Sequence, residues 1–171
     1  MKVVAVTPID VRSPRHNLVP NGDFKTWWAG AATPEEFQPP DPRSSRLARM
    51  VGLSGSNFAA RQVWNEGDAA ATPDRHFSAE VVLEPDTAYA LSVTAELRAG
   101  RGVSVGVREL GADGAPAAED AARITLLPSE GVCKRYERTF TPARGGRALV
   151  LSRAESAADV VWYDWRLAEG K

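Results

Sequence analysis

The chain has 171 residues, a length that suits one domain, and with 43% hydrophobic and 25% charged residues its composition is that of an ordinary globular protein. A chain of this size buries a core without the help of disulfides. The formal net charge of -1 excludes a general electrostatic attraction to nucleic acid, and no apolar run is long enough to cross a bilayer. Cys133 is the single cysteine, which excludes an internal disulfide and a thiolate metal cluster.

The first predicted element is an N-terminal arm or linker over residues 1–16, whose valines allow one edge strand. Lys2 is the only positive charge in residues 1–8, and that stretch lacks the charged, apolar and cleavage regions of a signal peptide. Two interpretations stay open for localisation. Either the protein is not exported by that route, or the domain belongs to a longer secreted or cell-surface chain.

The next segments contain the strongest turn signals. Residues 17–29 hold the turn sequence PNGD, followed by Phe24, Trp27 and Trp28. Residues 30–45 are rich in proline and acidic residues and are predicted to form a long loop.

From residue 46 onward, short runs of alternating apolar residues are separated by turn residues, a pattern that predicts β-strands. The predicted strands cover residues 46–53, 58–64, 77–83, 87–98, 103–110, 122–127, 133–140, 148–153 and 160–167. The clearest is 87–98, in which five alternate residues share one face: Tyr89, Leu91, Val93, Ala95 and Leu97.

About eight to ten short strands at regular spacing argue for a sandwich or barrel. A parallel fold would need helical crossovers between strands, and the sequence has no such pattern. The sequence therefore predicts an all-β fold, with residues 17–171 forming one antiparallel β-sandwich binding domain.

Three segments carry a resemblance to a known family. They are NLVPNGDF at residues 17–24, VVLEPDTAYALSV at residues 81–93 and VWYDWRL at residues 161–167. In this order and spacing they resemble strands of carbohydrate-binding modules of the xylan- or cellulose-binding type, which have the galactose-binding-like jelly-roll fold. The resemblance implies a two-sheet antiparallel β-sandwich, often attached to polysaccharide-degrading enzymes, that binds glycans through aromatic side chains.

The chain departs from that family at two acidic positions. The family usually has an acidic residue directly after the opening Phe, where this chain has Lys25, and Asp followed by Asp or Asn in the closing strand, where this chain has Tyr163 and Asp164. In the family those positions commonly help to hold a structural calcium. Because an ammonium group repels a cation that needs oxygen ligands, we expect Lys25 to pair with Asp164 and to replace the ion. No metal and no other cofactor is predicted.

Sugars present apolar C–H faces, on which Trp and Tyr stack, and hydroxyl groups, to which Arg and Gln bind. The candidate ligand-binding residues are Trp27, Trp64, Gln62, Trp162, Tyr136 and Arg138. Parity along the strands places Gln62 beside Trp64, with Arg61 on the other face, and places Tyr136 beside Arg138.

Parity also separates the tryptophans. Trp165 shares a face with Leu167 and is predicted to be core, which turns Trp162 to the opposite side. Trp27 is predicted to be the exposed member of the Trp27–Trp28 pair, unless a turn reverses them. Each candidate has a structural alternative, since a Trp in a β-sandwich is more often core than platform.

The sequence offers little catalytic chemistry. It has two histidines, His16 and His76, and no HExxH motif, GxSxG elbow or phosphate-binding loop. The chain is therefore predicted to be a non-catalytic module that binds a polysaccharide or oligosaccharide, with no nucleic-acid or membrane partner.

Two alternatives to the non-catalytic module remain. One is a structural or assembly β-sandwich, as in phage particles, that contacts protein or a second copy of itself through the N-terminal arm. The other is a jelly-roll enzyme acting on polysaccharide.

Overall fold

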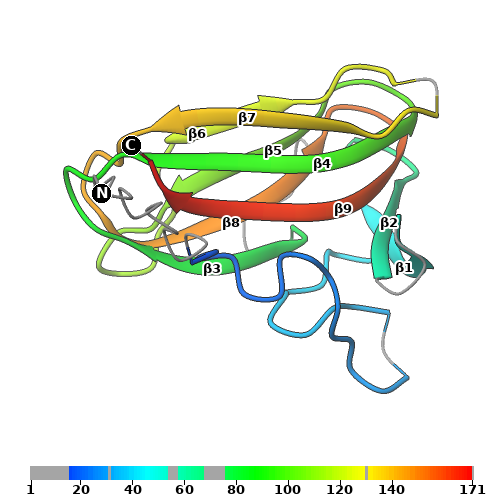
Figure 1. Ribbon diagram of the computed structural model, residues 1–171, viewed down its shortest axis with the longest axis horizontal. Helices are drawn as coiled ribbons and strands as arrows, with labels where there is room; N and C mark the ends of the chain where they lie inside the picture. The colour runs from blue at the N-terminus through cyan, green and yellow to red at the C-terminus, as the bar shows by residue number, and fades with distance from the viewer. Residues whose placement is uncertain (1–15, 31, 54–57, 68–75, 130, 171) are drawn as a thin grey trace, which may run out of the picture.

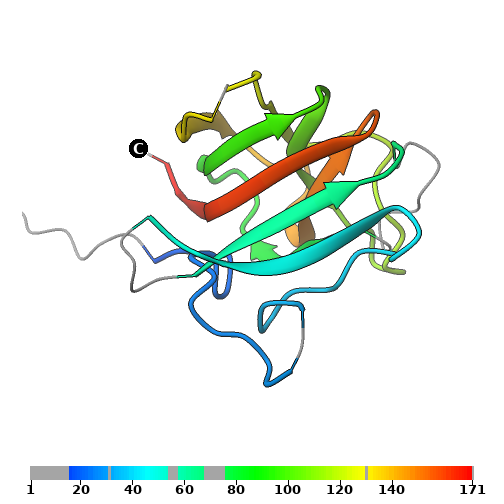
Figure 2. The same ribbon diagram turned by 90° about the vertical axis from the view of Figure 1, so that its right-hand side faces the viewer.

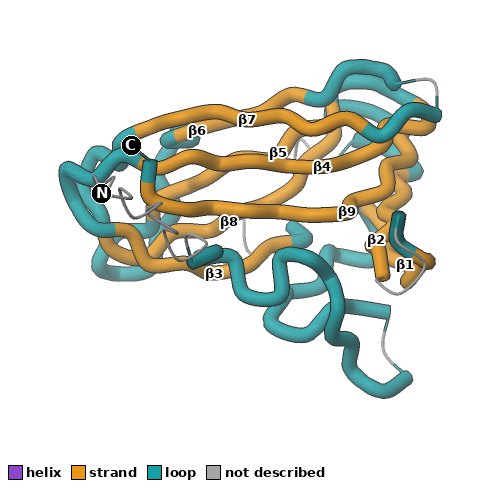
Figure 3. Tube along the Cα trace, viewed as in Figure 1, coloured by secondary structure: helices purple, strands orange, loops and turns teal. Residues whose placement is uncertain are grey.

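The computed structural model describes residues 16–30, 32–53, 58–67, 76–129 and 131–170, and in this part of the chain it contains strands and no helix (Figure 3). The strands are β1 (Ser45–Val51), β2 (Phe58–Trp64), β3 (Ser78–Leu83), β4 (Tyr89–Ala99), β5 (Val103–Glu109), β6 (Ala122–Thr125), β7 (Lys134–Phe140), β8 (Gly146–Ala154) and β9 (Ala158–Glu169). The predicted strands from residue 46 onward are confirmed, with ends that differ by one or two residues. The predicted arm lies, apart from His16, outside the described residues.

The strands form two antiparallel sheets that pack face to face (Figure 1). The five-stranded sheet has the order β1-β2-β9-β4-β7 and the four-stranded sheet has the order β3-β8-β5-β6. Several neighbouring strands come from distant parts of the chain, as β2 and β9 or β3 and β8 do, so the sandwich closes only when both halves of the sequence are present. The prediction of an all-β antiparallel sandwich is confirmed.

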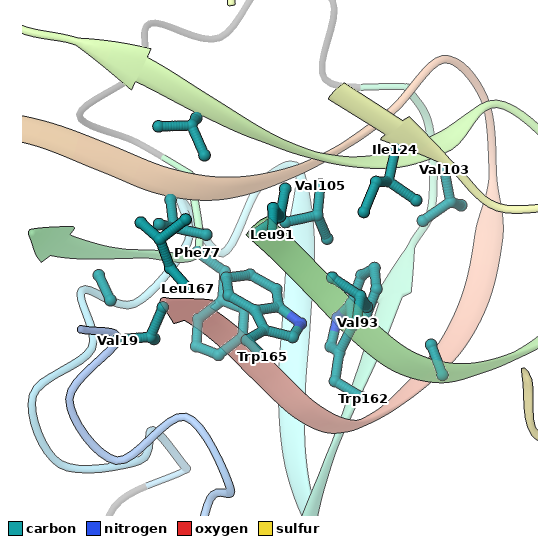
Figure 4. Close-up of a cluster of buried hydrophobic side chains, with 14 of the residues drawn as sticks. Val19, Phe77, Leu91, Val93, Val103, Val105, Ile124, Trp162, Trp165 and Leu167 are labelled. Atoms are coloured by element: carbon teal, nitrogen blue, oxygen red, sulfur yellow. The ribbon is translucent and has the colours of Figure 1, made fainter. Parts of the chain in front are cut away.

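The hydrophobic core lies between the two sheets. All five alternate residues predicted to share one face of the strand over 87–98 are buried in it. Figure 4 shows Trp162 and Trp165 packed with core residues of both sheets, including Val93 and Val105. Their ring centroids lie 5.3 Å apart in an edge-to-face arrangement, which is a favourable geometry for aromatic pairs.

The segment before β1 completes the core with aromatic side chains. Phe24 and Phe37 pack against Phe77 and Trp165, with ring centroids 4.8 Å apart for Phe37 and Phe77 and 6.1 Å apart for Phe24 and Trp165. The rest of this segment projects from the sandwich as a long loop (Figure 2). The predicted loop over residues 30–45 is thus confirmed for its described residues up to 44.

Residues 17–29 contain turns and one isolated bridge instead of the opening strand of the family pattern. Asn17 joins this segment to β9, because its side chain donates to the Trp165 carbonyl at 3.0 Å and accepts from the Leu167 amide at 2.9 Å. Gly22 lies so close to β9 that an added Cβ would stand 2.0 Å from the Trp165 carbonyl oxygen. The PNGD sequence therefore serves as a tight turn against the last strand.

A β-bulge in β9 reverses the parity on which the orientation of Trp162 was predicted. Thr94 of β4 pairs with Asp164, but the next residue, Ala95, pairs with Trp162, which leaves Tyr163 as an extra residue. As a result Trp162 and Trp165 both point inward, although they are three residues apart. The prediction that Trp162 points away from Trp165 is wrong for this reason.

Candidate functional site

Three of the sequence-predicted ligand residues lie inside the sandwich. Trp64, Gln62 and Trp162 are each at most 1% exposed, so none of them presents a surface to a ligand. Gln62 and Trp64 do share a face, as predicted, but it is the inner face.

Gln62 is the centre of a hydrogen-bonded group that links the two sheets. Its amide donates to the Ser45 hydroxyl at 2.9 Å. Its carbonyl accepts from the Ser152 hydroxyl at 2.8 Å and from Trp162 Nε1 at 3.0 Å. Because Ser152 belongs to β8 of the opposite sheet, these bonds satisfy buried polar atoms across the core and connect the two sheets.

The tryptophans of the projecting loop are arranged in the opposite way to the prediction. Trp27 is partly buried against the core and donates from Nε1 to the Phe24 carbonyl at 2.7 Å, whereas Trp28 is 59% exposed. Phe24 adopts a φ of 55°, so the segment turns there and strand parity does not carry through it. Trp28 is therefore the exposed aromatic side chain of this loop.

Tyr136 and Arg138 share a face of β7, as predicted, and lie along the side of the sandwich. The Tyr136 hydroxyl is 3.4 Å from the Leu127 carbonyl, and Arg138 donates to the Arg123 carbonyl at 3.3 Å. Arg123 belongs to β6 and Leu127 lies two residues after its end, so the pair covers the gap between the edge strands of the two sheets.

The predicted pairing of Lys25 with Asp164 is wrong. Lys25 Nζ lies 2.8 Å from Asp23, its neighbour two residues earlier, because the turn at Phe24 brings these side chains together. Burial raises the pKa of the Asp164 carboxyl, and Asp23 adds to the shift, while Arg166, Arg135 and Lys25 oppose it. No cluster of three or more His, Cys, Asp or Glu side chains able to hold a metal ion occurs among the described residues.

A second set of polar side chains lies on the outer face of the five-stranded sheet. Arg61 of β2 and Glu96 of β4 both stand opposite Val161 of β9, one on each side. Residues directly opposite one another on antiparallel strands point to the same face, so a row of side chains crosses three strands. We call this row the polar strip; its members are Arg61, Glu96, Arg98, Asp159 and Tyr163.

The members of the polar strip are tied to one another by short contacts. Arg61 donates to both carboxylate oxygens of Asp159, at 3.0 and 2.6 Å, in a bidentate pair. Glu96 accepts from the Tyr163 hydroxyl at 3.2 Å and from Arg98 Nε at 3.2 Å. The strip thus holds two ion pairs beside an aromatic ring, with its functional groups oriented before any ligand arrives.

The electrostatics of the strip follow from these pairs. The Asp159 carboxylate raises the pKa of Arg61 through its hydrogen bond and charge. Burial raises the pKa of the Tyr163 phenol, and the Glu96 carboxylate raises it further. Both shifts favour the form that the group has at physiological pH, which is charged for Arg61 and neutral for Tyr163. With two arginines and two carboxylates, the formal charges of the strip balance.

The sequence interpretation missed the polar strip although one signal for it was present. Parity along residues 58–64 placed Arg61 on the face opposite to Gln62 and Trp64, so assigning those two residues to the core would have exposed Arg61. Tyr163 could not be found in this way, because it stands at the bulge in β9.

A hollow of about 550 Å³ lies elsewhere, along residues 109–121 with Ala143 and Arg144. Its lining contains no aromatic side chain. The polar strip, with Tyr163, therefore offers the combination of ring and planar polar groups that sugar chemistry favours.

Comparison with known proteins supports the fold. No protein-family model matches the sequence, and no curated protein matches it significantly. Solved structures do match. The CBM22-1 xylan-binding domain of Paenibacillus barcinonensis Xyn10C is similar with a TM-score of 0.60 at 10% identity, over 82% of this chain and 90% of that one.

Two further structures show the range of proteins with this fold. TmCBM61, solved with β-1,4-galactotriose, has a TM-score of 0.52 at 15% identity, over 91% of this chain and 99% of that one. Tailspike protein 4 of bacteriophage CBA120 has a TM-score of 0.61 at 11% identity, over 90% of this chain and 21% of that one. The chain therefore has the jelly-roll fold of carbohydrate-binding modules, and the predicted resemblance is confirmed for the fold.

Proposed function

We propose that this chain is a non-catalytic carbohydrate-binding domain that holds a neutral oligosaccharide or polysaccharide on the polar strip. The observation that carries the proposal is the gathering of Tyr163 and two Arg–carboxylate pairs on the outer face of the five-stranded sheet. A likeness in fold to a xylan-binding domain and to a module solved in complex with β-1,4-galactotriose supports it, because the ligands of those proteins are glycans.

The chemistry of the strip suits a sugar. A tyrosine ring packs on the apolar C–H face of a pyranose, while paired guanidinium and carboxylate groups exchange hydrogen bonds with hydroxyls. The row crosses β2, β9 and β4, which at the usual strand spacing is about 10 Å and matches a short oligosaccharide better than a single sugar. The balance of charges favours a neutral ligand over a charged one.

The side chains of the polar strip favour binding of a glycan over its hydrolysis. A glycosidase needs one carboxyl group that is protonated and can act as the acid. Both carboxylates of the strip, Asp159 and Glu96, are instead paired with arginine. We therefore expect no release of reducing sugar from any glycan that the protein binds.

The test is a screen of immobilised glycans, followed by calorimetry on the best ligand with single substitutions. Tyr163→Ala is expected to weaken binding at least about tenfold, or about 1.4 kcal/mol. Matched controls are Tyr136→Ala, on the side of the sandwich, and Trp28→Ala, on the projecting loop, each expected to change the affinity by less than about twofold.

The outcomes separate the candidate sites. Loss of binding in Tyr136→Ala alone would move the site to the Tyr136–Arg138 pair, and loss in Trp28→Ala alone would move it to the loop with Trp27. Binding to no glycan at all would refute the proposal.

A second candidate function is contact with protein, favoured by apolar side chains at the end of β1. Val51 and Leu53 are each 67% exposed, an arrangement typical of an interaction surface. The occurrence of this fold in a bacteriophage tailspike protein is compatible with an assembly role. Sedimentation velocity tests it, because self-association that the double substitution Val51→Ser and Leu53→Ser abolishes would support this role, and a monomer at all concentrations would oppose it.

A further inference from the structure

Three arginines converge on one aspartate on the outer face of the four-stranded sheet. They are Arg108 of β5, Arg123 of β6 and Arg153 of β8, and the aspartate is Asp120, just before β6. We call these four residues the arginine cluster. It lies on the other sheet from the polar strip, so an inference from it goes beyond the proposed function.

The contacts to Asp120 are direct. Arg108 Nε donates to its Oδ1 at 3.0 Å, and Arg123 Nε lies 3.2 Å from its Oδ2, to which Arg153 also donates. Gly106 lies beneath the carboxylate, since an added Cβ there would be 2.9 Å from Oδ2. Because Gly106 has no side chain, the Asp120 carboxylate packs directly against the sheet, among the three guanidinium groups.

The cluster has more positive charge than Asp120 can neutralise. Three guanidinium groups face one carboxylate, which leaves an excess of two positive charges. Burial lowers the pKa of Arg153, and although Asp120 opposes that shift, the charges of Arg123 and Arg108 strengthen it. The three arginines therefore repel one another, and no second carboxylate pairs with them among the described residues.

The cluster also has an unsatisfied donor. Arg153 Nε is buried and has no hydrogen-bond partner among the described residues. A single arginine, such as Arg108, would be enough to hold the loop before β6 in place through Asp120. Two further arginines add repulsion and desolvation cost without serving that purpose, so the arrangement is better explained by a second anion.

We propose that the arginine cluster binds an oxyanion group beside Asp120, either the carboxylate of an acidic sugar or a sulfate ester. The guanidinium group is planar and presents paired N–H donors, a geometry that matches both kinds of anion. Arg123, whose side chain is 48% exposed, forms the open side through which the anion enters, while Asp120 is 7% exposed and forms the floor.

The test uses sodium sulfate and sodium glucuronate as probes, with sodium chloride at the same ionic strength as reference. Binding is followed by calorimetry and by the thermal midpoint, because an anion that binds only the folded state raises the midpoint. Sulfate or glucuronate is expected to raise the midpoint of the wild-type protein above that in chloride. Because sulfate stabilises folded proteins in general, the anion whose effect is reduced more by Arg123→Gln identifies whether the natural group is a sulfate or a uronate.

Substitutions locate the effect. Arg123→Gln is expected to weaken anion binding about tenfold, while Arg135→Gln, an exposed arginine of β7 on the other sheet, leaves it unchanged. Asp120→Asn removes the competing carboxylate and is expected to tighten anion binding, provided that circular dichroism shows the fold intact. Tyr163→Ala is expected to leave anion binding unchanged, so this proposal and the glycan proposal can fail separately.

The proposal is overturned if neither anion exceeds chloride. It is also overturned if Arg123→Gln binds the anions as well as the wild-type protein does.

Discussion

Gln62 shows how a single polar residue can hold the two layers of a sandwich together. It contacts Ser45 in its own sheet, Ser152 in the other sheet and the indole of Trp162. Removing the amide would leave three buried groups without their partner, and each such group costs free energy.

Replacing Gln62 with Leu is therefore expected to lower the free energy of unfolding by about 3 kcal/mol. Urea unfolding measures this free energy. Ser152→Ala serves as the matched control, with an expected loss of about 1 kcal/mol, because Trp162 keeps the Gln62 carbonyl as its acceptor. Equal losses for the two variants would contradict a central role for Gln62.

Asp164 gives a residue-scale prediction for pH. Its folded pKa is raised, chiefly by burial, so the folded protein binds a proton more tightly than the unfolded chain does. The loss of folding free energy that comes from the buried charge is absent below the unfolded pKa and is complete above the folded pKa. Asp164 therefore makes the protein less stable as pH rises from the unfolded pKa through the folded pKa.

Asp164→Asn is accordingly expected to be more stable than the wild-type protein at neutral pH, with a difference that disappears as pH falls below the ordinary range of an aspartate. Urea unfolding at a series of pH values measures the difference. The same series on Asp86→Asn, in an exposed turn before β4, is the matched control for the substitution. A difference that is independent of pH would contradict the assignment.

At the scale of elements, Glu109 fastens the turn that leads into β8. Its carboxylate accepts from three consecutive backbone amides, those of Ala143, Arg144 and Gly145, at 3.1, 3.0 and 3.0 Å. Gly145 has a φ of 71°, a conformation that glycine adopts without strain. The end of β5 thus determines the path of a turn more than thirty residues later in the chain.

Glu109→Gln is expected to destabilise the protein by about 2 kcal/mol. The substitution removes the negative charge and replaces one carboxylate oxygen with an NH2 group, which is a donor and faces the backbone N–H donors. Hydrogen exchange of the amides of residues 143–145 should accelerate more than that of β4. Glu80→Gln, which breaks an exposed pair with Arg147, is the control with an expected loss below about 1 kcal/mol. Unchanged exchange at residues 143–145 would contradict this role for Glu109.

At the scale of the whole molecule, the two sheets share one core. Trp64, Trp162 and Trp165 are buried in it, and Gln62 bonds across it, so neither sheet can lose the other and keep its packing. Unfolding is therefore expected to be a single cooperative transition.

No helix that could span a membrane is found among the described residues.

Tryptophan fluorescence, which reports the core, and far-ultraviolet circular dichroism, which reports the strands, should give the same midpoint in urea. Trp28→Ala removes the most exposed indole and should leave that midpoint within experimental error. Two separate transitions would mean that the sheets unfold independently, in contradiction to a shared core.

Sequence alone determined the class of this fold, because alternation with a period of two is a local property of each strand. It located β4 and its buried face, and the resemblance at three segments predicted the jelly roll. It also placed Arg61 on the opposite face of its strand from Gln62, and Tyr136 on the same face as Arg138, since side chains alternate between faces in any regular strand.

Tertiary structure decided which face of each strand is inside and where parity breaks. The bulge at Tyr163 turned Trp162 inward, and the turn at Phe24 exposed Trp28 and paired Lys25 with Asp23. The polar strip and the arginine cluster each join residues from three strands or their flanking loops that are far apart in the sequence. Because such contacts depend on strand order and register, which no local pattern encodes, only the folded chain brings these charges together.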